Sequence, residues 1–410
     1  MIHPWIKEYI LLALRIDKAF RRMDDWPFVD YFYGPAELRA DVEREEEKSG
    51  AELARAAIAL GDALPAQNFE RSRANFLEKH VSTMEVLCRK LSGQRFIMQE
   101  VIQRCLDLEP VWQPESEFER ALALLDQALP GTGDLRGRYL KFRQETVLPP
   151  QQPELVLRLM LRMLSEARRR TQRFVNLPEK EELDVNVVRE KPYGAANWYL
   201  GGYRSRLELN VDHPVNLLAL LYQMCHEGYP GHHTEFVLKE KYLYHASGYT
   251  EQSIFIVGPQ LVIAEGIASL AQEMIFTPEE IEKWLTEQIF TEAGIPVSNL
   301  DLPKISEAFA ANMLDDLDAN LALMLWDGHS DEELVEYALE YTPHTQEQIR
   351  RVVQSLKSPL RQIYAFTYSQ GKRLMRPLLQ DDNRCQVFRR LLTEPIYPSL
   401  LAEWAEAEDI

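Results

Sequence analysis

The spacing of apolar residues most constrains the fold of this chain, because they recur at every third or fourth position over most of its length. This is the period of an α-helix with one buried face, and clusters of Pro and Gly divide the pattern into segments. The first twenty residues are expected to form an amphipathic helix. Further helices are predicted over 35–65, 72–91, 94–108, 115–129, 134–146 and 153–174. Residues 1–180 are therefore expected to form a helical scaffold half.

A different pattern occupies residues 183–211, where apolar and polar side chains alternate around Gly201-Gly202. A period of two is typical of strands, and paired glycines favour a tight turn, so a small antiparallel β-hairpin or sheet is predicted. Asp212 and Pro214 mark the start of a helix over 217–227, and most of the chain after residue 260 again reads as helix. The expected fold class is mostly α, with 1–180 and 181–410 as lobes of one continuous unit.

The charge balance excludes two classes of partner. The 410 residues include 46 Lys or Arg and 64 Asp or Glu, which gives a formal charge of −18. Nucleic acids and anionic membranes attract proteins through basic patches, so neither is an expected partner. The N-terminal apolar run over 10–14 is too short for a signal peptide or a membrane span, and the four cysteines are widely separated. These features predict a cytoplasmic protein.

The densest chemical signal is the segment HEGYPGHH, residues 226–233, which holds three of the nine histidines. Neutral imidazole binds zinc, and a carboxylate beside a zinc-bound water can take its proton. The usual spacing is His-Glu-x-x-His, which places both histidines on one helix face. In this chain the fourth residue after His226 is Pro230. The remaining histidines, at positions 3, 80, 213, 245, 329 and 344, stand alone and are expected to be structural or exposed.

The unusual spacing leaves two candidates for the second histidine ligand. On an ideal helix His232 lies about 120° around the axis from His226, whereas His233 shares its face but lies about 10 Å further along. Pro230 and the glycine after it are expected to open the helix and reset its phase, which favours His232 over His233. The third ligand is predicted to be Glu265, which lies 38 residues after Glu227 in an apolar helical stretch.

The blocks NWYLGGYRSRLELN, HEGYPGHHTE, AEGIASL and YAFTYSQG together resemble the domain-of-unknown-function family numbered 885, whose hallmark is His-Glu-x-x-Pro-Gly-His-His. The resemblance spans residues 180–375. That family is similar to the helical zinc peptidases of the thimet oligopeptidase, angiotensin-converting enzyme and Taq carboxypeptidase types. The resemblance implies a helical zincin-like fold, a Zn²⁺ cofactor, and roles for His226, Glu227, His232 or His233, and Glu265. The family's downstream Asp-x-Gly-Leu-His segment is not found, because residues 318–326 read DANLALMLW.

Additional residues are candidates to stabilise the transition state or to bind the substrate. Tyr364 and Tyr368 are four residues apart on a predicted helix, and Tyr368 fits the family's Tyr-x-x-Gly pattern, so it is the preferred donor to an oxyanion. Arg204 and Arg206 share one face of a predicted strand and are candidates to bind a substrate carboxylate. The edge of a hairpin strand is a candidate to pair with an extended peptide.

The sequence therefore predicts a zinc-dependent metallohydrolase, most simply a peptidase for short peptides, with residues 181–410 as its catalytic half. Glu227 is expected to deprotonate water and pass the proton to the leaving amine. One alternative is a zinc hydrolase for a non-peptide amide or ester. The other is a catalytically inactive protein that binds a peptide or small molecule on the same scaffold. The oligomeric state is left open.

Overall fold

The computed structural model describes residues 2–406 except 25, 149–151, 192, 213, 297–300, 312–316 and 381, so His213 lies outside the described residues. Within them the chain is mostly helical, which confirms the fold class at that level. The helices are α1 (Pro4–Phe20), α2 (Ala36–Arg44), α3 (Gly50–Ala63), α4 (Arg71–Leu91), α5 (Met98–Leu106), α6 (Glu115–Ala128), α7 (Leu135–Glu145), α8 (Pro153–Thr171), α9 (Leu217–Glu227), α10 (His232–Lys239), α11 (Pro259–Ile275), α12 (Pro278–Trp284), α13 (Thr291–Ala293), α14 (Leu302–Ala311), α15 (Asp318–Trp326), α16 (Asp331–Tyr341), α17 (Gln346–Ser355), α18 (Pro359–Tyr364), α19 (Thr367–Met375), α20 (Arg384–Thr393) and α21 (Pro398–Glu406).

Most predicted helices are present, with ends that differ by a few residues, but the helix expected over 35–65 is wrong. It is two helices, α2 and α3, because Glu45 turns to extended backbone after α2. Ser49 then caps α3, since its hydroxyl accepts from the amide of Glu52 while the Glu52 carboxylate accepts from the amide of Ser49. Such a reciprocal capping box starts a new helix whatever the apolar spacing across it.

The strands are short: β1 (Val29–Phe32), β2 (Val147–Leu148), β3 (Glu182–Val188), β4 (Ala195–Gly201), β5 (Arg204–Asn210), β6 (Val215–Asn216) and β7 (Ile254–Ile256). The predicted hairpin is β4 and β5, which pair antiparallel across Gly201 and Gly202, both at positive φ. β3 pairs with β5 in parallel, so the sheet is mixed, in the order β3-β5-β4. The β1–β7 and β2–β6 pairs form two further antiparallel sheets.

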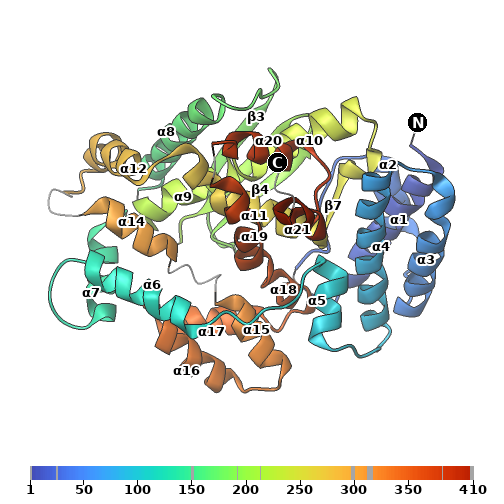
Figure 1. The fold of residues 1–410 in the computed structure, drawn as a ribbon, viewed down its shortest axis with the longest axis horizontal. Helices are drawn as coiled ribbons and strands as arrows, with labels where there is room; N and C mark the ends of the chain where they lie inside the picture. Colours follow the sequence, from blue (N-terminus) through green and yellow to red (C-terminus); the bar gives the residue numbers. More distant parts are fainter. Residues whose placement is uncertain are drawn as a thin grey trace.

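Helix α11 lies at the centre of the molecule, between two hydrophobic cores. Figure 1 shows α11 and α19 in the middle of the view, with α1–α4 on the right and α15–α17 at the bottom. Val262 and Ala264 on α11 belong to the core built largely on the N-terminal helices. Ile263 and Ile267 belong to the other core, with side chains from α8 and α9. Both cores draw residues from before and after residue 180, so α11 is held on all sides.

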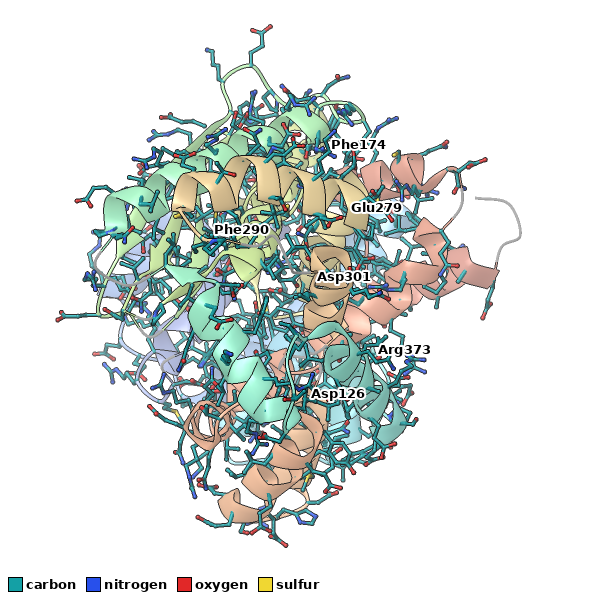
Figure 2. The ribbon with its side chains drawn as sticks, turned by 90° about the vertical axis from the view of Figure 1, so that its left-hand side faces the viewer. Asp126, Phe174, Glu279, Phe290, Asp301 and Arg373 are labelled. Atoms are coloured by element: carbon teal, nitrogen blue, oxygen red, sulfur yellow. The ribbon has the colours of Figure 1, made fainter. Side chains whose placement is uncertain are left out.

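The acidic residues spread over the surface. Figure 2 looks onto the left-hand side of Figure 1 and labels Glu279, Asp301 and Asp126, all of which are exposed on that face. Solvated carboxylates of this kind account for negative charge without a dedicated partner. Among the described residues, none of the helices combines the length and apolar character needed to cross a membrane.

Candidate metal centre

The histidine-rich segment ends one helix and begins the next. α9 stops at Glu227, and the loop 228–231 leads into α10, whose first residue is His232. The amide of Gly231 donates to a carbonyl in the last turn of α9 at 3.0 Å. A Cβ at Gly231 would lie 1.9 Å from the carbonyl oxygen of His226. Only glycine fits this contact, so the loop folds α10 closely back against the end of α9.

Both helix ends meet the carboxylate of Glu265 on α11. One ligand atom from each of His226, His232 and Glu265 lies within 4.8 Å of the others. Oε2 of Glu265 is 3.5 Å from Nε2 of His226, and Oε1 is 3.7 Å from Nε2 of His232. Among the described residues, Oε2 of Glu265 has no hydrogen-bond partner. Two imidazole nitrogens and one carboxylate oxygen are a donor set of catalytic zinc sites, which keep a position for water. The residues present therefore fit a zinc ion.

His232 and Glu265 have the protonation states that a metal requires of its ligands. Burial lowers the pKa of His232 to about 4, against an opposing effect of Glu265, so the imidazole is neutral at pH 7. Burial by itself raises the pKa of Glu265, but His232, His226 and the hydroxyl of Tyr364 outweigh it and lower the pKa overall. His232 thus offers a neutral nitrogen and Glu265 an ionised carboxylate without a prior proton loss.

Glu227 lies beside this cluster, and its carboxyl group has a raised pKa. Its side chain is partly buried, and burial together with the charge of Glu265 raises its pKa to about 7, although His226 acts in the opposite direction. A carboxyl group with a pKa near 7 exchanges protons readily at neutral pH. Asn197 on β4 donates from Nδ2 to the main-chain carbonyl of Glu227 at 2.6 Å, which ties the sheet to the end of α9.

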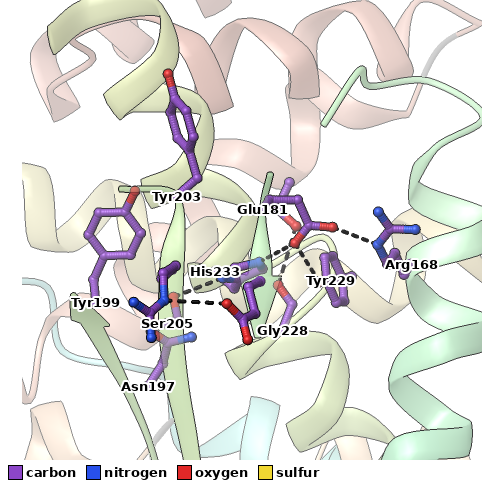
Figure 3. Close-up of polar contacts among 12 residues, drawn as sticks. Arg168, Glu181, Asn197, Tyr199, Tyr203, Ser205, Gly228, Tyr229 and His233 are labelled. Atoms are coloured by element: carbon purple, nitrogen blue, oxygen red, sulfur yellow. Dashed lines mark hydrogen bonds and ion pairs between the residues drawn. The ribbon is translucent and has the colours of Figure 1, made fainter. Parts of the chain in front are cut away.

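The structure places His233 away from the cluster. Its Nδ1 is 2.8 Å from Oγ of Ser205 on β5, and its Nε2 is 2.8 Å from Oε2 of Glu181 (Figure 3). Both ring nitrogens are therefore engaged. Glu181 also accepts from Nε of Arg168 at 2.6 Å and from the hydroxyl of Tyr229 at 2.8 Å. Burial raises the pKa of Glu181, but these donors prevail and lower it to about 2, so it stays ionised.

Ser205, His233 and Glu181 form a hydrogen-bonded series like that of a serine hydrolase, but its burial excludes that chemistry. Ser205 is 1% exposed, His233 is 0% exposed and the Glu181 side chain is 1% exposed. A nucleophile must reach its substrate, and this hydroxyl does not. The three residues instead anchor the first turn of α10 to the sheet, directly beside His232.

The two tyrosines reach the cluster from separate helices. α18 ends at Tyr364 and α19 begins at Thr367, so the single helix predicted over both tyrosines is wrong. The rings of Tyr364 and Tyr368 still lie 5.5 Å apart between centroids. The hydroxyl of Tyr364 donates to Oε1 of Glu265. The ring of Tyr368 stacks beside His226 at 6.3 Å between centroids.

Two glycines bring α19 close enough to α11 for these contacts. A Cβ at Gly371 would lie 2.5 Å from the carbonyl oxygen of Val262, and one at Gly266 would lie 2.8 Å from the side chain of Met375. The glycines of Glu-Gly in AEGIASL and of Tyr-x-x-Gly in YAFTYSQG are thus explained by the same helix contact. These glycines let the two backbones meet, and this contact helps to bring the tyrosines beside Glu265.

Behind Tyr364 lies a buried ion pair between Arg361 and Asp318, the first residue of α15. The Arg361 guanidinium is 5.7 Å from the centroid of the Tyr364 ring and 5.4 Å from that of Trp26. The segment DANLALMLW therefore contributes a carboxylate that holds a cation against Tyr364. Sequence reasoning missed this pair, because nothing in the local pattern indicates the partner of Asp318.

The structure does not bring Arg204 and Arg206 to the cluster. Both side chains are exposed on β5 and pair with β3, Arg204 with Glu182 at 3.4 Å and Arg206 with Asp184 at 3.3 Å. Side chains alternate between the faces of a strand. Because the intervening Ser205 faces His233, the two arginines lie on the opposite face of the sheet, away from α10.

Sequence reasoning also missed Asp30, on β1. Its carboxylate interacts electrostatically with Glu265 and Glu227, and it also affects the hydroxyl of Tyr364. Asp30 precedes the histidine segment by nearly two hundred residues and belongs to no metal-binding spacing. The only signal near it is a β-like run of apolar residues, which does not report the position of a lone carboxylate.

Comparisons with known proteins add information on the fold. No family model matches the chain, and no curated protein matches it. Over 96% of the chain, the structure resembles a putative lipoprotein from Colwellia psychrerythraea, covering 75% of that protein with a TM-score of 0.56 and 13% identity. It also resembles a putative lipoprotein of unknown function from Shewanella oneidensis, with a TM-score of 0.50, 10% identity, and coverage of 90% of this chain and 76% of that one. These likenesses concern the fold alone.

Proposed function

We propose that this protein is a zinc-dependent hydrolase of short peptides. The observation that carries the proposal is the convergence of His226, His232 and Glu265 within 4.8 Å. The adjacent Glu227, whose pKa of about 7 suits proton transfer at neutral pH, supports it. A zinc ion held by the three residues supplies a Lewis acid that acidifies water and polarises the scissile carbonyl. The resemblance to the family numbered 885 agrees with this assignment.

The residues around the cluster take separate parts in the proposed reaction. Glu227 accepts a proton from the attacking water at its carboxylate and delivers it to the leaving nitrogen. Tyr368 donates from its hydroxyl to the oxyanion, whereas Tyr364 is held by Glu265 and positions that carboxylate. An extended peptide adds to the outer edge of β4, which pairs only with β5 among the described strands and which Asn197 ties to the end of α9.

The test compares three glutamate variants of protein purified without a histidine tag. Glu265→Gln is expected to lose stoichiometric zinc. Glu227→Gln is expected to keep zinc and to lower kcat on short peptides by roughly 10²–10⁴-fold. Glu273→Gln is the matched control, because Glu273 lies on the same helix as Glu265 but is exposed and paired with Arg376 at 2.7 Å. Wild-type protein without zinc, or full hydrolysis by Glu227→Gln, rejects the proposal.

A second candidate is a non-catalytic binding protein on the same scaffold. It is favoured by the absence of a histidine from α15 and by the engagement of the Tyr364 hydroxyl with Glu265. It predicts stoichiometric zinc without cleavage in a broad library of peptides, amides and esters. If the protein cleaves esters or non-peptide amides but not peptides, the same centre serves a hydrolase with a different substrate.

The cellular setting stays a prediction. The four cysteines are free thiols, as expected in a reducing compartment, and we propose a cytoplasmic location without nucleic acid or membrane partners. Fractionation of cells that express the full-length protein tests this directly.

A further inference from the structure

Asp30 occupies a bulge in the sheet of β1 and β7. Val29 pairs with Ile256 and Tyr31 pairs with Phe255, so Asp30 is the extra residue of the longer strand. Its neighbours Val29 and Tyr31 are both buried, whereas Asp30 is exposed. Bulges are common beside active sites, where they redirect a side chain. This bulge presents one carboxylate between two residues that face the core.

The backbone around Asp30 is held firmly on both sides. The amide of Val29 donates to Oδ1 of the buried Asp17 at 3.0 Å. The ring of Tyr31 packs edge-on against Phe236 on α10, with 5.0 Å between centroids, and tilts against Phe255 at 5.3 Å. The chain therefore fixes the origin of the Asp30 side chain relative to α10, which carries His232.

The carboxylate of Asp30 lies near the cluster of His226, His232 and Glu265, and no ion pair among the described residues neutralises it. Its charge interacts with Glu265 on α11 and Glu227 on α9, and contributes to the high pKa of the Tyr364 hydroxyl on α18. Among the described residues, no hydrogen bond or ion pair engages the Asp30 carboxylate. A carboxylate held beside two others without a cation is costly unless something else supplies the charge.

The charges around the centre favour a cationic ligand. In ionised form Asp30, Glu227 and Glu265 carry three negative charges, and a zinc ion compensates two of them. Arg361, the guanidinium close to Tyr364, is already paired with Asp318. Arg204 and Arg206 lie on the far face of the sheet. A substrate carboxylate would meet unbalanced negative charge here, whereas an ammonium group would neutralise it.

We propose that Asp30 binds the α-ammonium group of the substrate, so that this protein cleaves peptides close to a free N-terminus. The inference rests on the proposed peptidase function and names its substrate class. A primary ammonium has three donors and a unit charge, which matches an unpaired carboxylate. The bulge fixes where this carboxylate leaves the strand, and the contact of Tyr31 with Phe236 ties that strand to α10, which carries His232.

The experiment measures binding separately from turnover. Zinc-loaded Glu227→Gln protein is titrated by calorimetry with tetra-alanine amide and with its N-acetylated form. The free amine is expected to bind roughly ten- to a hundredfold more tightly. Adding Asp30→Asn is expected to abolish this preference, and Asp30→Glu to restore part of it. Asp184→Asn on β3 is the matched control and is expected to leave the preference intact.

The outcomes separate this inference from the function on which it rests. Equal binding of the two peptides by the Glu227→Gln protein that retains Asp30 overturns the inference. Loss of zinc from a folded Asp30→Asn protein also overturns it, because Asp30 would then be a metal ligand. In the enzyme with Glu227 intact, Asp30→Asn is expected to raise KM for free peptides much more than it lowers kcat, with little effect on acetylated ones. Equal cleavage of both peptides rejects the role of Asp30 and leaves the peptidase proposal standing. Absence of all cleavage with retained amine preference rejects the peptidase and keeps the ammonium site.

Discussion

The hydroxyl of Tyr364 donates a hydrogen bond to Oε1 of Glu265, the same oxygen that faces Nε2 of His232. Burial, followed by the charge of Glu265, raises the pKa of Tyr364 well above its usual value, so the hydroxyl keeps its proton and stays a donor. A donor on one carboxylate oxygen fixes the rotation of the group and leaves Oε2 directed toward His226. Tyr364 therefore positions the carboxylate of Glu265, the proposed metal ligand.

Two tyrosine variants separate positioning from transition-state stabilisation. Tyr364→Phe is expected to weaken zinc binding roughly 10–100-fold, because the orientation of Glu265 is lost. Tyr368→Phe is expected to lower kcat roughly 10²–10³-fold with little change in zinc affinity. Competition with a chromogenic chelator measures affinity, and peptide hydrolysis measures kcat. The opposite pattern, with zinc lost only from Tyr368→Phe, would reverse the two assignments.

Adjacent histidines are expected to respond differently to substitution. His232→Gln removes a proposed ligand, so its zinc content after dialysis is expected to fall to near zero while the protein stays folded. His233→Gln is expected to retain zinc but to lower the free energy of unfolding by about 3 kcal/mol, because it disturbs the buried pairing with Glu181 and Ser205. Metal analysis and urea unfolding of the two variants distinguish the loss of a ligand from the loss of stability. Retention of zinc by His232→Gln would contradict the ligand set.

Gly231 is expected to tolerate no side chain. A Cβ there lies 1.9 Å from the carbonyl oxygen of His226, so Gly231→Ala must displace α10 and carry His232 away from Glu265. We expect a loss of stability of about 2–4 kcal/mol and much weaker zinc binding. Gly61→Ala on α3 is the control, because its nearest atom would be a Val81 methyl at 3.5 Å. The control is expected to be neutral or stabilising by up to about 1 kcal/mol.

His80 is expected to make the stability of the fold depend on pH, independently of the proposed metal centre. Burial lowers its pKa to about 4, against about 6.5 in an unfolded chain. The unfolded state therefore takes up a proton at higher pH than the folded state does. The contribution of His80 to stability is complete above pH 6.5 and decreases as the pH falls toward 4, by about 3 kcal/mol in total.

His80→Gln removes this titration, so the decline in its stability across that window is expected to be shallower than that of the wild type. Urea unfolding of zinc-free protein at pH 7, 6, 5 and 4.5 measures the difference. His329→Gln is the control, since His329 is exposed and pairs with Glu333 at 3.5 Å. Parallel wild-type and His80→Gln curves would show instead that the pKa of His80 is the same in the folded and unfolded states.

Local sequence patterns predicted the structure correctly where the contacts that determine it lie close together along the chain. The helix periods, the Gly201-Gly202 turn and the break at Pro230-Gly231 depend on neighbouring backbone, and the sequence indicated each of them. The helix predicted across 45–49 failed for a local reason, since Ser49 and Glu52 begin a new helix. The break between Tyr364 and Tyr368 has no comparable local signal.

The sequence by itself therefore determined the helical class, the hairpin and a segment that places His226 and Glu227 just before a helix break and two further histidines just after it. Only the tertiary structure decided which histidine faces Glu265, because the loop geometry at Gly231 and the burial of His233 against Glu181 set the direction of α10. It also decided that Arg204 and Arg206 face away, since alternation places them on one face but cannot say which face is covered. Asp30 and the pair of Arg361 with Asp318 join the centre only through packing between distant segments, and no local pattern encodes such a contact.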